Sequence, residues 1–210
     1  MTQKSAVILL GSPGSGKTAI ANRLASGNGV QTMEIRRLVH SEVVAGTKIG
    51  EKLKPFLNES KLVPTEIVAE VVQKRIQQLD TSVILFDGFP HQEDEISAFF
   101  DLFQEGKFDR FAVIVLEVPR ELAVYRMLNR RSKRPEDKPD TVNERLDIYE
   151  RDTVPVINYF QTNYPERTYF ESVDKPIKQT VGSIVSNLHQ VGIDIYLTLS
   201  EMIIKLSPSK

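Results

Sequence analysis

The sequence predicts an α/β protein built on a parallel sheet, and three observations lead to this fold class. Short runs of apolar, β-branched and aromatic residues alternate with segments of helical periodicity along 210 residues. The runs at 6–10, 83–86 and 111–116 are almost continuously apolar, as expected for central parallel strands covered on both faces. Strands that alternate with helices imply right-handed crossovers, and a chain of this length fits one domain with small inserted lobes.

The predicted elements follow each other in a simple order with two exceptions. We expect strands at 6–10, 30–33, 83–86, 111–116 and 168–170. We expect helices at 16–25, 36–44, 49–58, 64–79, 92–103, 120–129, 141–163 and 176–191. Pro64 and Pro176 suit the first turn of their helices, where a missing N–H is tolerated. The first exception is 36–79, which has helices but no strand and therefore indicates an inserted helical lobe. The second is 130–140, rich in charge and proline, which indicates an exposed loop.

The overall composition excludes several classes of function. Lys and Arg number 27 and Asp and Glu 28, so no net charge favours nucleic acid or an anionic membrane. There is no cysteine and there are only three histidines, which excludes disulfides and makes a zinc site an unfavourable interpretation. No apolar stretch reaches the length of a membrane span, and the run at 6–10 is too short for a signal peptide. We therefore expect a cytoplasmic protein without nucleic-acid or membrane partners.

Residues 11–18, GSPGSGKT, match the phosphate-loop pattern GxxxxGK[ST] between a predicted strand and a predicted helix. The glycines let successive backbone N–H groups point into one concavity, and the helix N-terminus adds positive potential there. The Lys17 ammonium can reach the β- and γ-phosphates of a nucleoside triphosphate, and the Thr18 hydroxyl can bind Mg²⁺. The loop residues expected to contact the nucleotide are Gly11, Pro13, Gly14, Ser15, Gly16, Lys17 and Thr18.

A second signal is the apolar strand VILF at 83–86, which ends in Asp87. A carboxylate at the end of a parallel strand lies at the same sheet edge as the phosphate loop, and it can hold Mg²⁺ directly or through water. The predicted metal residues are therefore Thr18 and Asp87.

Several short motifs, in order along the chain, resemble the adenylate kinase family of P-loop nucleoside monophosphate kinases. They are AGTKIG at 45–50, KLVP at 61–64, DGFP at 87–90, RPED at 134–137 with Arg145 beyond it, and then Tyr149, Pro155 and Val156. The resemblance spans about residues 5–190. It implies a three-layer α/β/α P-loop NTPase fold with a five-stranded parallel sheet, and ATP with Mg²⁺ as co-substrate. It also implies a single domain over 1–210, divided as follows: a core at 1–34, 80–130 and 139–192, a monophosphate-binding lobe at 35–64, a short lid at 131–138 and a C-terminal extension at 193–210.

The resemblance carries over well for the half of the site that binds the phosphate donor. The positions of the family's phosphate-binding lysine and arginines hold Lys17, Arg126, Arg130, Arg134 and Arg145. Guanidinium groups match phosphate geometry and stay charged, so they can stabilise a transferring phosphoryl group. The resemblance thus implies Lys17, Arg130, Arg134 and Arg145 as catalytic residues, with Arg126 and Arg130 also binding the nucleotide.

The acceptor half departs from the family pattern at four positions. Ile35 stands where the family has a threonine, His40 and His91 where it has arginines, and Glu95 where it has the glutamine that reads adenine. An imidazole has a pKa near ~6.5, so these exchanges weaken monophosphate binding unless the phosphate raises the pKa of both histidines. A shifted alignment would put Arg37 on the first arginine position, and Arg36 and Arg37 could instead supply the missing positive charge. The acceptor residues implied by the resemblance are Ile35, His40, Lys61, Val63, Gly88, His91, Glu95, Arg134 and Arg145.

Three hypotheses for function follow. The first is transfer of the γ-phosphoryl group of ATP to a nucleoside monophosphate, with AMP as the default acceptor. The second keeps the chemistry but uses GMP, which an ionised Glu95 could recognise, or a non-nucleotide phosphate. The third is an ATP-binding regulatory module with a decayed acceptor site. We expect small-molecule nucleotides as partners and a monomer. The apolar patch 193–204 is interpreted as an additional core element or as a contact with a second copy or a partner.

Overall fold

The computed structural model describes residues 4–26, 29–58, 63–130 and 138–195, and five strands lie at the predicted places. The strands are β1 (Ser5–Gly11), β2 (Val30–Glu34), β3 (Val83–Asp87), β4 (Arg110–Glu117) and β5 (Thr168–Ser172). The helices before β4 are α1 (Lys17–Leu24), α2 (Ile35–Val44), α3 (Lys48–Asn58), α4 (Thr65–Gln78) and α5 (Asp94–Gln104). Those after β4 are α6 (Arg120–Leu128), α7 (Pro139–Ile148), α8 (Val154–Asn163) and α9 (Ile177–Gln190).

The five strands form one parallel sheet in the order β2-β3-β1-β4-β5. Strand β1 is central, so that Val7 lies beside Leu85 of β3 on one side and Ala112 of β4 on the other. After β1 the chain forms β2 at one edge of the sheet and β3 between β2 and β1. It then crosses to the other side of β1 to form β4. Ligands of open parallel sheets bind at such a reversal, beyond the carboxyl ends of the strands. The segment after β1 is therefore placed for binding.

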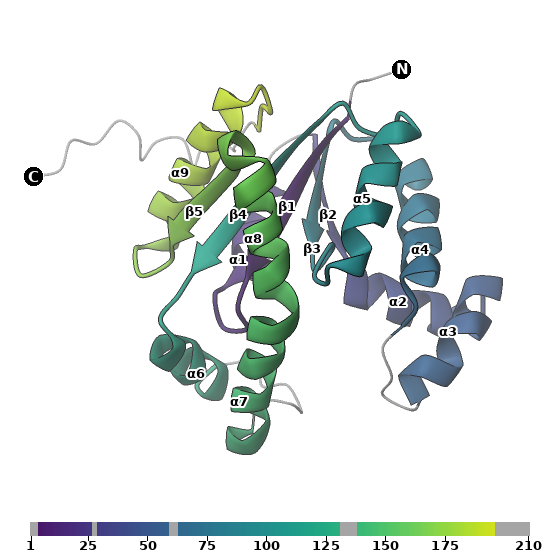
Figure 1. The fold of residues 1–210 in the computed structure, drawn as a ribbon, viewed down its shortest axis with the longest axis horizontal. Coiled ribbons are helices and arrows are strands. Elements are labelled where there is room, and N and C mark those ends of the chain that lie inside the picture. Colours follow the sequence, from purple (N-terminus) through teal and green to yellow (C-terminus); the bar gives the residue numbers. More distant parts are fainter. Residues whose placement is uncertain (1–3, 27–28, 59–62, 131–137, 196–210) are drawn as a thin grey trace, which may run out of the picture.

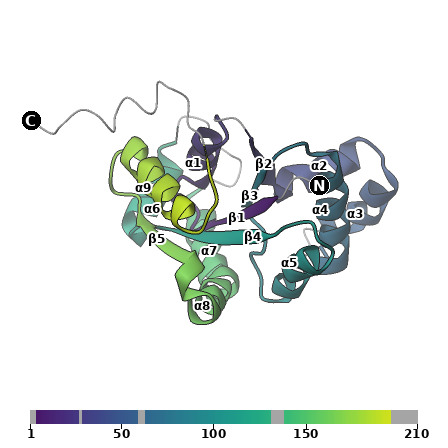
Figure 2. The same ribbon diagram turned by 90° about the horizontal axis from the view of Figure 1, so that it is seen from above.

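The two faces of the sheet are covered by different helices, which gives three layers (Figures 1 and 2). Alternate residues of β1 face opposite sides: Val7 and Leu9 pack with α1 and α9, whereas Ala6, Ile8 and Leu10 pack with α4, α5 and α8. Burial of the strand on both faces explains why its sequence is apolar throughout. The predicted three-layer α/β/α fold with a five-stranded parallel sheet is confirmed.

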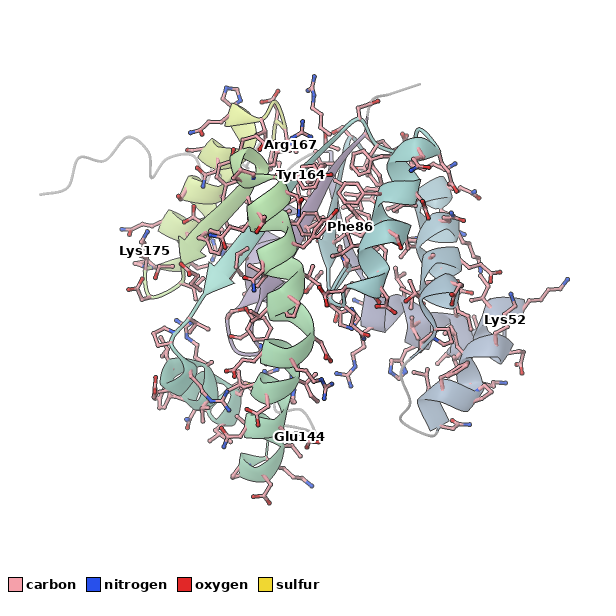
Figure 3. The ribbon with its side chains drawn as sticks, viewed as in Figure 1. Lys52, Phe86, Glu144, Tyr164, Arg167 and Lys175 are labelled. Atoms are coloured by element: carbon pink, nitrogen blue, oxygen red, sulfur yellow. The ribbon has the colours of Figure 1, made fainter. Side chains whose placement is uncertain are left out.

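Phenylalanines fill the layer between the sheet and helices α5 and α8. Phe99 of α5 is fully buried and contacts Phe86, Phe111 and Phe160 edge to face, with ring centroids 6.0, 5.9 and 6.2 Å away. This geometry is favourable for aromatic pairs. In Figure 3, Phe86 lies inside the molecule, while Lys52 and Glu144 extend outward from α3 and α7. The cluster supports the strand end that carries Asp87.

The helix predicted over 141–163 is interrupted by a π-helical turn. The turn spans Tyr149–Thr153, between α7 and α8. Pro155 explains the interruption, because it has no N–H to donate to the carbonyl four residues earlier, and the hydrogen-bond ladder must change there. The predicted segment is therefore helical along its whole length, but the sequence did not predict the π-helical turn within it. Pro64 and Pro176 also differ slightly from expectation, since each lies at the N-cap rather than in the first turn.

Two groups of helices flank the carboxyl ends of the strands. Helices α2 and α3 lie on one side of these ends, and α6 and α7 lie on the other (Figure 1). The division into core, monophosphate-binding lobe, lid and C-terminal extension stays a prediction. All of the predicted lid except Lys138, and the extension beyond residue 195, lie outside the described residues. Within the part of the chain that the structure describes, no helix is long and apolar enough to cross a membrane.

Candidate active site

The phosphate loop bends tightly between β1 and α1. The Ser15 N–H donates to the Ser12 carbonyl over 3.1 Å, which closes the turn. Gly16, at the N-cap of α1, has φ 89°, a conformation that L side chains rarely adopt. At Gly14, a Cβ atom would lie 2.5 Å from the Ala123 carbonyl oxygen, so that only glycine fits against α6. The glycine at position 16 thus has a conformational cause, and the glycine at position 14 has a steric cause in the contact with α6.

Two side chains in the first turn of α1 form contacts that bear on phosphate and metal binding. The Lys17 ammonium donates to the carbonyls of Gly11 and Ser12, the latter over 3.0 Å, and so lies over the loop itself. The Thr18 hydroxyl donates to Asp87 Oδ2 over 3.3 Å. Thr18 lies in the first turn of α1, the helix that follows β1, and Asp87 ends β3, the strand paired with β1. A hydroxyl and a carboxylate beside a phosphate loop form a set of oxygen donors that suits Mg²⁺.

One large cavity of about 1050 Å³ opens beside the loop, and it is lined from both groups of helices. The α2–α4 region contributes mainly apolar side chains to the wall, and the α6–α7 region contributes arginines. The predicted site residues on the wall are Gly11, Pro13, Gly14, Gly16, Lys17, Thr18, Ile35, Val63, His40, Asp87, Gly88, His91, Glu95, Arg126, Arg130 and Arg145. The structure therefore brings most of the predicted donor and acceptor residues to one cavity.

One predicted site residue in the described part of the chain is not on this wall. The Ser15 side chain lies beneath the loop with 1% of the residue exposed, and its hydroxyl has no hydrogen-bond partner among the described atoms. Only the Ser15 backbone is therefore placed to contact a phosphate. Lys61 and Arg134 lie outside the described residues. The roles assigned to all of these residues stay predictions.

Positive charge dominates the described part of the cavity wall. Five Lys and Arg side chains face three Asp and Glu side chains. They are Lys17, Arg36, Arg126, Arg130 and Arg145, against Glu34, Asp87 and Glu95. Arg126 also donates to the Val173 carbonyl over 2.8 Å, which ties α6 to the segment after β5. A cavity with this excess of cations favours a polyanion such as a nucleotide.

The acceptor side of the cavity contains a histidine–carboxylate pair. Glu95 is 3% exposed, and its Oε2 accepts from both the backbone N–H and Nδ1 of His91, each over 2.8 Å. Burial by itself lowers the pKa of His91, but the hydrogen bond and charge of Glu95 and the charges of Asp152 and Asp94 outweigh it and raise the pKa. His91 therefore gains positive charge near neutral pH.

Sequence reasoning missed the part that the π-helical turn takes in the site. The Thr153 hydroxyl donates to the His91 carbonyl over 3.1 Å, and Thr153 and Tyr149 both line the cavity. Burial, together with the charges of Glu117 and Glu150, raises the pKa of Tyr149 to about 12, so its phenol stays a hydrogen-bond donor. Tyr149 appeared only as part of a resemblance, and no spacing in the sequence points to Thr153. Pro155 was the one local signal of an irregular helix.

Arg36 is a further wall residue that the aligned motifs did not select. It lies on the first turn of α2, beside Ile35 and one turn before His40, and it lines the cavity, whereas Arg37 does not. The positive charge that the family places one turn later can thus come from Arg36 at this position.

A cavity of this size and charge, with a phosphate loop on its wall, defines a nucleotide-binding protein of the P-loop class. Comparisons with known proteins narrow the class. The sequence model of the adenylate kinase family matches residues 9–164. An adenylate kinase of a Synechococcus species is 33% identical over 158 residues, which are 75% of this chain and 85% of that relative. The adenylate kinase of Thermosynechococcus vestitus is 31% identical over 195 residues, 89% of this chain and 98% of the relative. That of Thermus thermophilus is 32% identical over 158 residues, 74% and 83% of the two chains.

The chain belongs to the adenylate kinase family. It is accordingly an enzyme of the nucleoside monophosphate kinase kind, as the motifs predicted.

Proposed function

We propose that this protein transfers the γ-phosphoryl group of ATP, bound with Mg²⁺, to a nucleoside monophosphate, with AMP as the default acceptor. The observation that carries the proposal is the single cavity that has the phosphate loop on one wall and the α2–α4 region on the other. Two phosphate groups can meet in it without leaving the protein, and positioning of this kind supplies most of the catalysis of phosphoryl transfer.

In this proposal the donor is held by the loop amides, Lys17, Arg126 and Arg130. Lys17 and the arginines, including Arg134 and Arg145, neutralise the charge that develops on the transferring group. Thr18 and Asp87 hold Mg²⁺. Among the described residues, no group of three or more acidic or histidine side chains could hold a metal ion. This fits Mg²⁺ bound by few protein oxygens, with phosphate and water completing its shell.

The acceptor binds on the opposite wall. Ile35, Val63 and Gly88 form the base pocket, Arg145 binds the acceptor phosphate, and Lys61 and Arg134 are further proposed acceptor residues. His40 and His91 take the places of two arginines in the family pattern. We further propose that the protein acts as a monomer in the cytoplasm, with residues 35–64 as the acceptor lobe and 131–138 as the lid.

A second candidate keeps the reaction and changes the acceptor to GMP or a non-nucleotide phosphate. The departures from the family pattern at His91 and Glu95 favour an acceptor other than AMP. The geometry of Glu95, however, disfavours GMP as that acceptor. Recognition of the guanine ring N–H and exocyclic amine takes both oxygens of a carboxylate, and Oε2 of Glu95 already accepts twice from His91.

An acceptor panel tests the proposal. The full-length protein is incubated with ATP and Mg²⁺ and with AMP, GMP, CMP, UMP or deoxynucleoside monophosphates in turn, and diphosphate product is measured. We expect the highest kcat/KM with AMP. A clear preference for another monophosphate would replace the default acceptor. ATP binding without transfer to any of them would contradict the proposed reaction.

A further inference from the structure

His91 and Glu95 form a closed structural unit at the acceptor side of the cavity. His91 lies between β3 and α5, and Glu95 is the second residue of α5. The carboxylate, with 4% of its side chain exposed, accepts from the backbone and the ring of the same histidine, over 2.8 Å each. A buried charge normally needs a partner of opposite sign, and the charged form of His91 supplies it.

The hydrogen bond fixes which nitrogen of the ring can meet a ligand. An ionised carboxylate only accepts, so Nδ1 of His91 carries a hydrogen. The remaining nitrogen, Nε2, lies 3.4 Å from the side-chain nitrogen of Gln92, and both residues line the cavity. When Nε2 is also protonated, the ring presents a cationic N–H donor. A phosphate monoester is a suitable acceptor for it.

The backbone of His91 is held from a second side. The Thr153 hydroxyl, in the π-helical turn, donates to the His91 carbonyl over 3.1 Å. The ring is thus held to α5 through Glu95, and the backbone that carries the ring is held to the α7–α8 connection through Thr153. A donor restrained from two elements loses little conformational freedom when it binds an anion.

The negative charges around His91 come from two elements. Glu95 and Asp94 lie on α5, Asp152 lies in the π-helical turn, and all three favour the cationic ring. Burial opposes them. The Arg36 and Arg145 cations line the same cavity. The carboxylate of Glu95 is the group in hydrogen-bond contact with the ring. It is therefore the group whose removal should affect the ring most.

We infer that His91 and Glu95 act as one acceptor-binding unit. His91 binds the acceptor phosphate through Nε2–H. Glu95 does not read the base; it is the positioning residue that keeps His91 charged. The inference rests on the proposed function, because it concerns the acceptor of that reaction. The positive charge at this position then depends on pH, whereas the arginine of the family pattern is charged at every relevant pH. Acceptor binding weakens as the pH rises past the point at which His91 loses its second proton, whereas donor binding does not.

The first experiment measures protonation without any reaction. The ring C–H signals of the three histidines are followed by NMR in the nucleotide-free, full-length protein against pH. His91→Asn and His189→Asn assign the signals. We expect the His91 midpoint to fall by about one pH unit or more in Glu95→Gln, the size expected from losing one charge-assisted hydrogen bond. Asp194→Asn is the matched control, because it removes the carboxylate from the exposed His189–Asp194 pair, which is outside the cavity.

The second experiment separates acceptor binding from chemistry. KM for AMP, KM for ATP and kcat are measured between about pH 5.5 and about pH 8.5, the range in which a histidine titrates. In the unmodified protein we expect KM for AMP to rise about tenfold with pH, from the loss of one charged contact, while KM for ATP stays constant. Glu95→Gln moves this rise to lower pH, Asp194→Asn leaves it in place, and His91→Arg abolishes it.

The outcomes distinguish a failure of this inference from a failure of the proposed function. No transfer to AMP or to any other monophosphate contradicts the proposed reaction, while the NMR titration still tests the pair. Transfer with a KM for AMP that does not change with pH, or a His91 midpoint that is the same in Glu95→Gln, overturns the inference alone. Circular dichroism shows whether Glu95→Gln folds. If it does not, His91→Asn, which keeps an N–H donor for Glu95, and His91→Arg carry the test through the pH dependence of KM.

Discussion

The Thr18 hydroxyl donates to Asp87 Oδ2 over 3.3 Å, and this contact joins the first turn of α1 to the carboxyl end of β3. Both residues are the proposed Mg²⁺ residues. We predict that Asp87→Asn and Thr18→Ala each lower kcat on the order of 100-fold, because the metal supplies several kcal/mol of charge stabilisation to phosphoryl transfer.

Titration of activity with Mg²⁺ checks this prediction. The variants should need more Mg²⁺ for half-maximal rate, whereas Thr18→Ser, which keeps the hydroxyl, should stay near the unmodified protein. An unchanged Mg²⁺ requirement in Asp87→Asn would remove Asp87 from the metal site.

Lys17 gives a second prediction. Its ammonium lies over the phosphate loop through hydrogen bonds to the carbonyls of Gly11 and Ser12. Lys17→Met should lower kcat by about 100- to 1000-fold, the range measured when one stabilising donor is removed from an active site. Steady-state kinetics at saturating ATP and AMP measure it. Lys178→Met, an exposed residue of α9, is the control, and an equal loss in both variants would contradict the role of Lys17.

Phe99 gives a prediction about stability. It is fully buried and contacts four other phenylalanine rings edge to face. Phe99→Ala should lower the free energy of unfolding by about 3–5 kcal/mol, from lost transfer energy and an incompletely filled cavity. Urea unfolding followed by circular dichroism measures the change. Phe99→Leu should cost less, and a loss in Phe99→Ala below about 1 kcal/mol would mean that the aromatic layer repacks freely.

The pair of Lys74 on α4 and Glu42 on α2 gives a prediction about pH. The Lys74 ammonium donates to both oxygens of Glu42, over 2.9 and 2.8 Å. This hydrogen bond, with one from Thr47 and the Lys74 charge, lowers the pKa of Glu42 against the opposing effect of burial. A lowered pKa means that the stabilisation is present above the unfolded-state value of 4.5 and is lost as the pH falls through the folded-state value.

Lys74→Met should therefore lower the free energy of unfolding by about 0.5–1 kcal/mol at neutral pH, and by less in acid. Urea unfolding at about pH 7 and about pH 3 tests this, because the lower pH lies below the unfolded-state pKa of 4.5, where the stabilisation by the Glu42 charge declines. Lys52→Met is the matched control, since the Lys52–Glu70 pair is more exposed, with 54% and 45% of its side chains accessible. A difference for Lys74→Met that does not depend on pH would contradict the role of the Glu42 charge.

Much of the fold could be predicted from the sequence, because its determinants are local. The apolar run of β1 is buried on both faces, and Gly14 and Gly16 have positive φ values of 84° and 89°, a local backbone requirement of the loop. The position of Asp87 followed in the same way, because a strand in a parallel sheet ends at a known edge.

The parts that could not be predicted depend on contacts between segments far apart in the chain. Glu95 looked like a residue for reading a base, but its oxygen is engaged by His91, whose backbone is held in turn by Thr153, 62 residues later. Ser15 fitted the phosphate-loop pattern, but the turn directs its side chain into the interior. Only three-dimensional packing decides such contacts, and no periodicity reports them.

The π-helical turn at Tyr149–Thr153 makes the length of this segment unusually important. Before it, Val142 and Leu146 pack against α6; after it, Val156 and Phe160 pack against the aromatic layer. Deleting one residue between them would rotate one half against the other by about 100°. Evolution can substitute residues here, but insertions and deletions would turn one of the two apolar faces toward water.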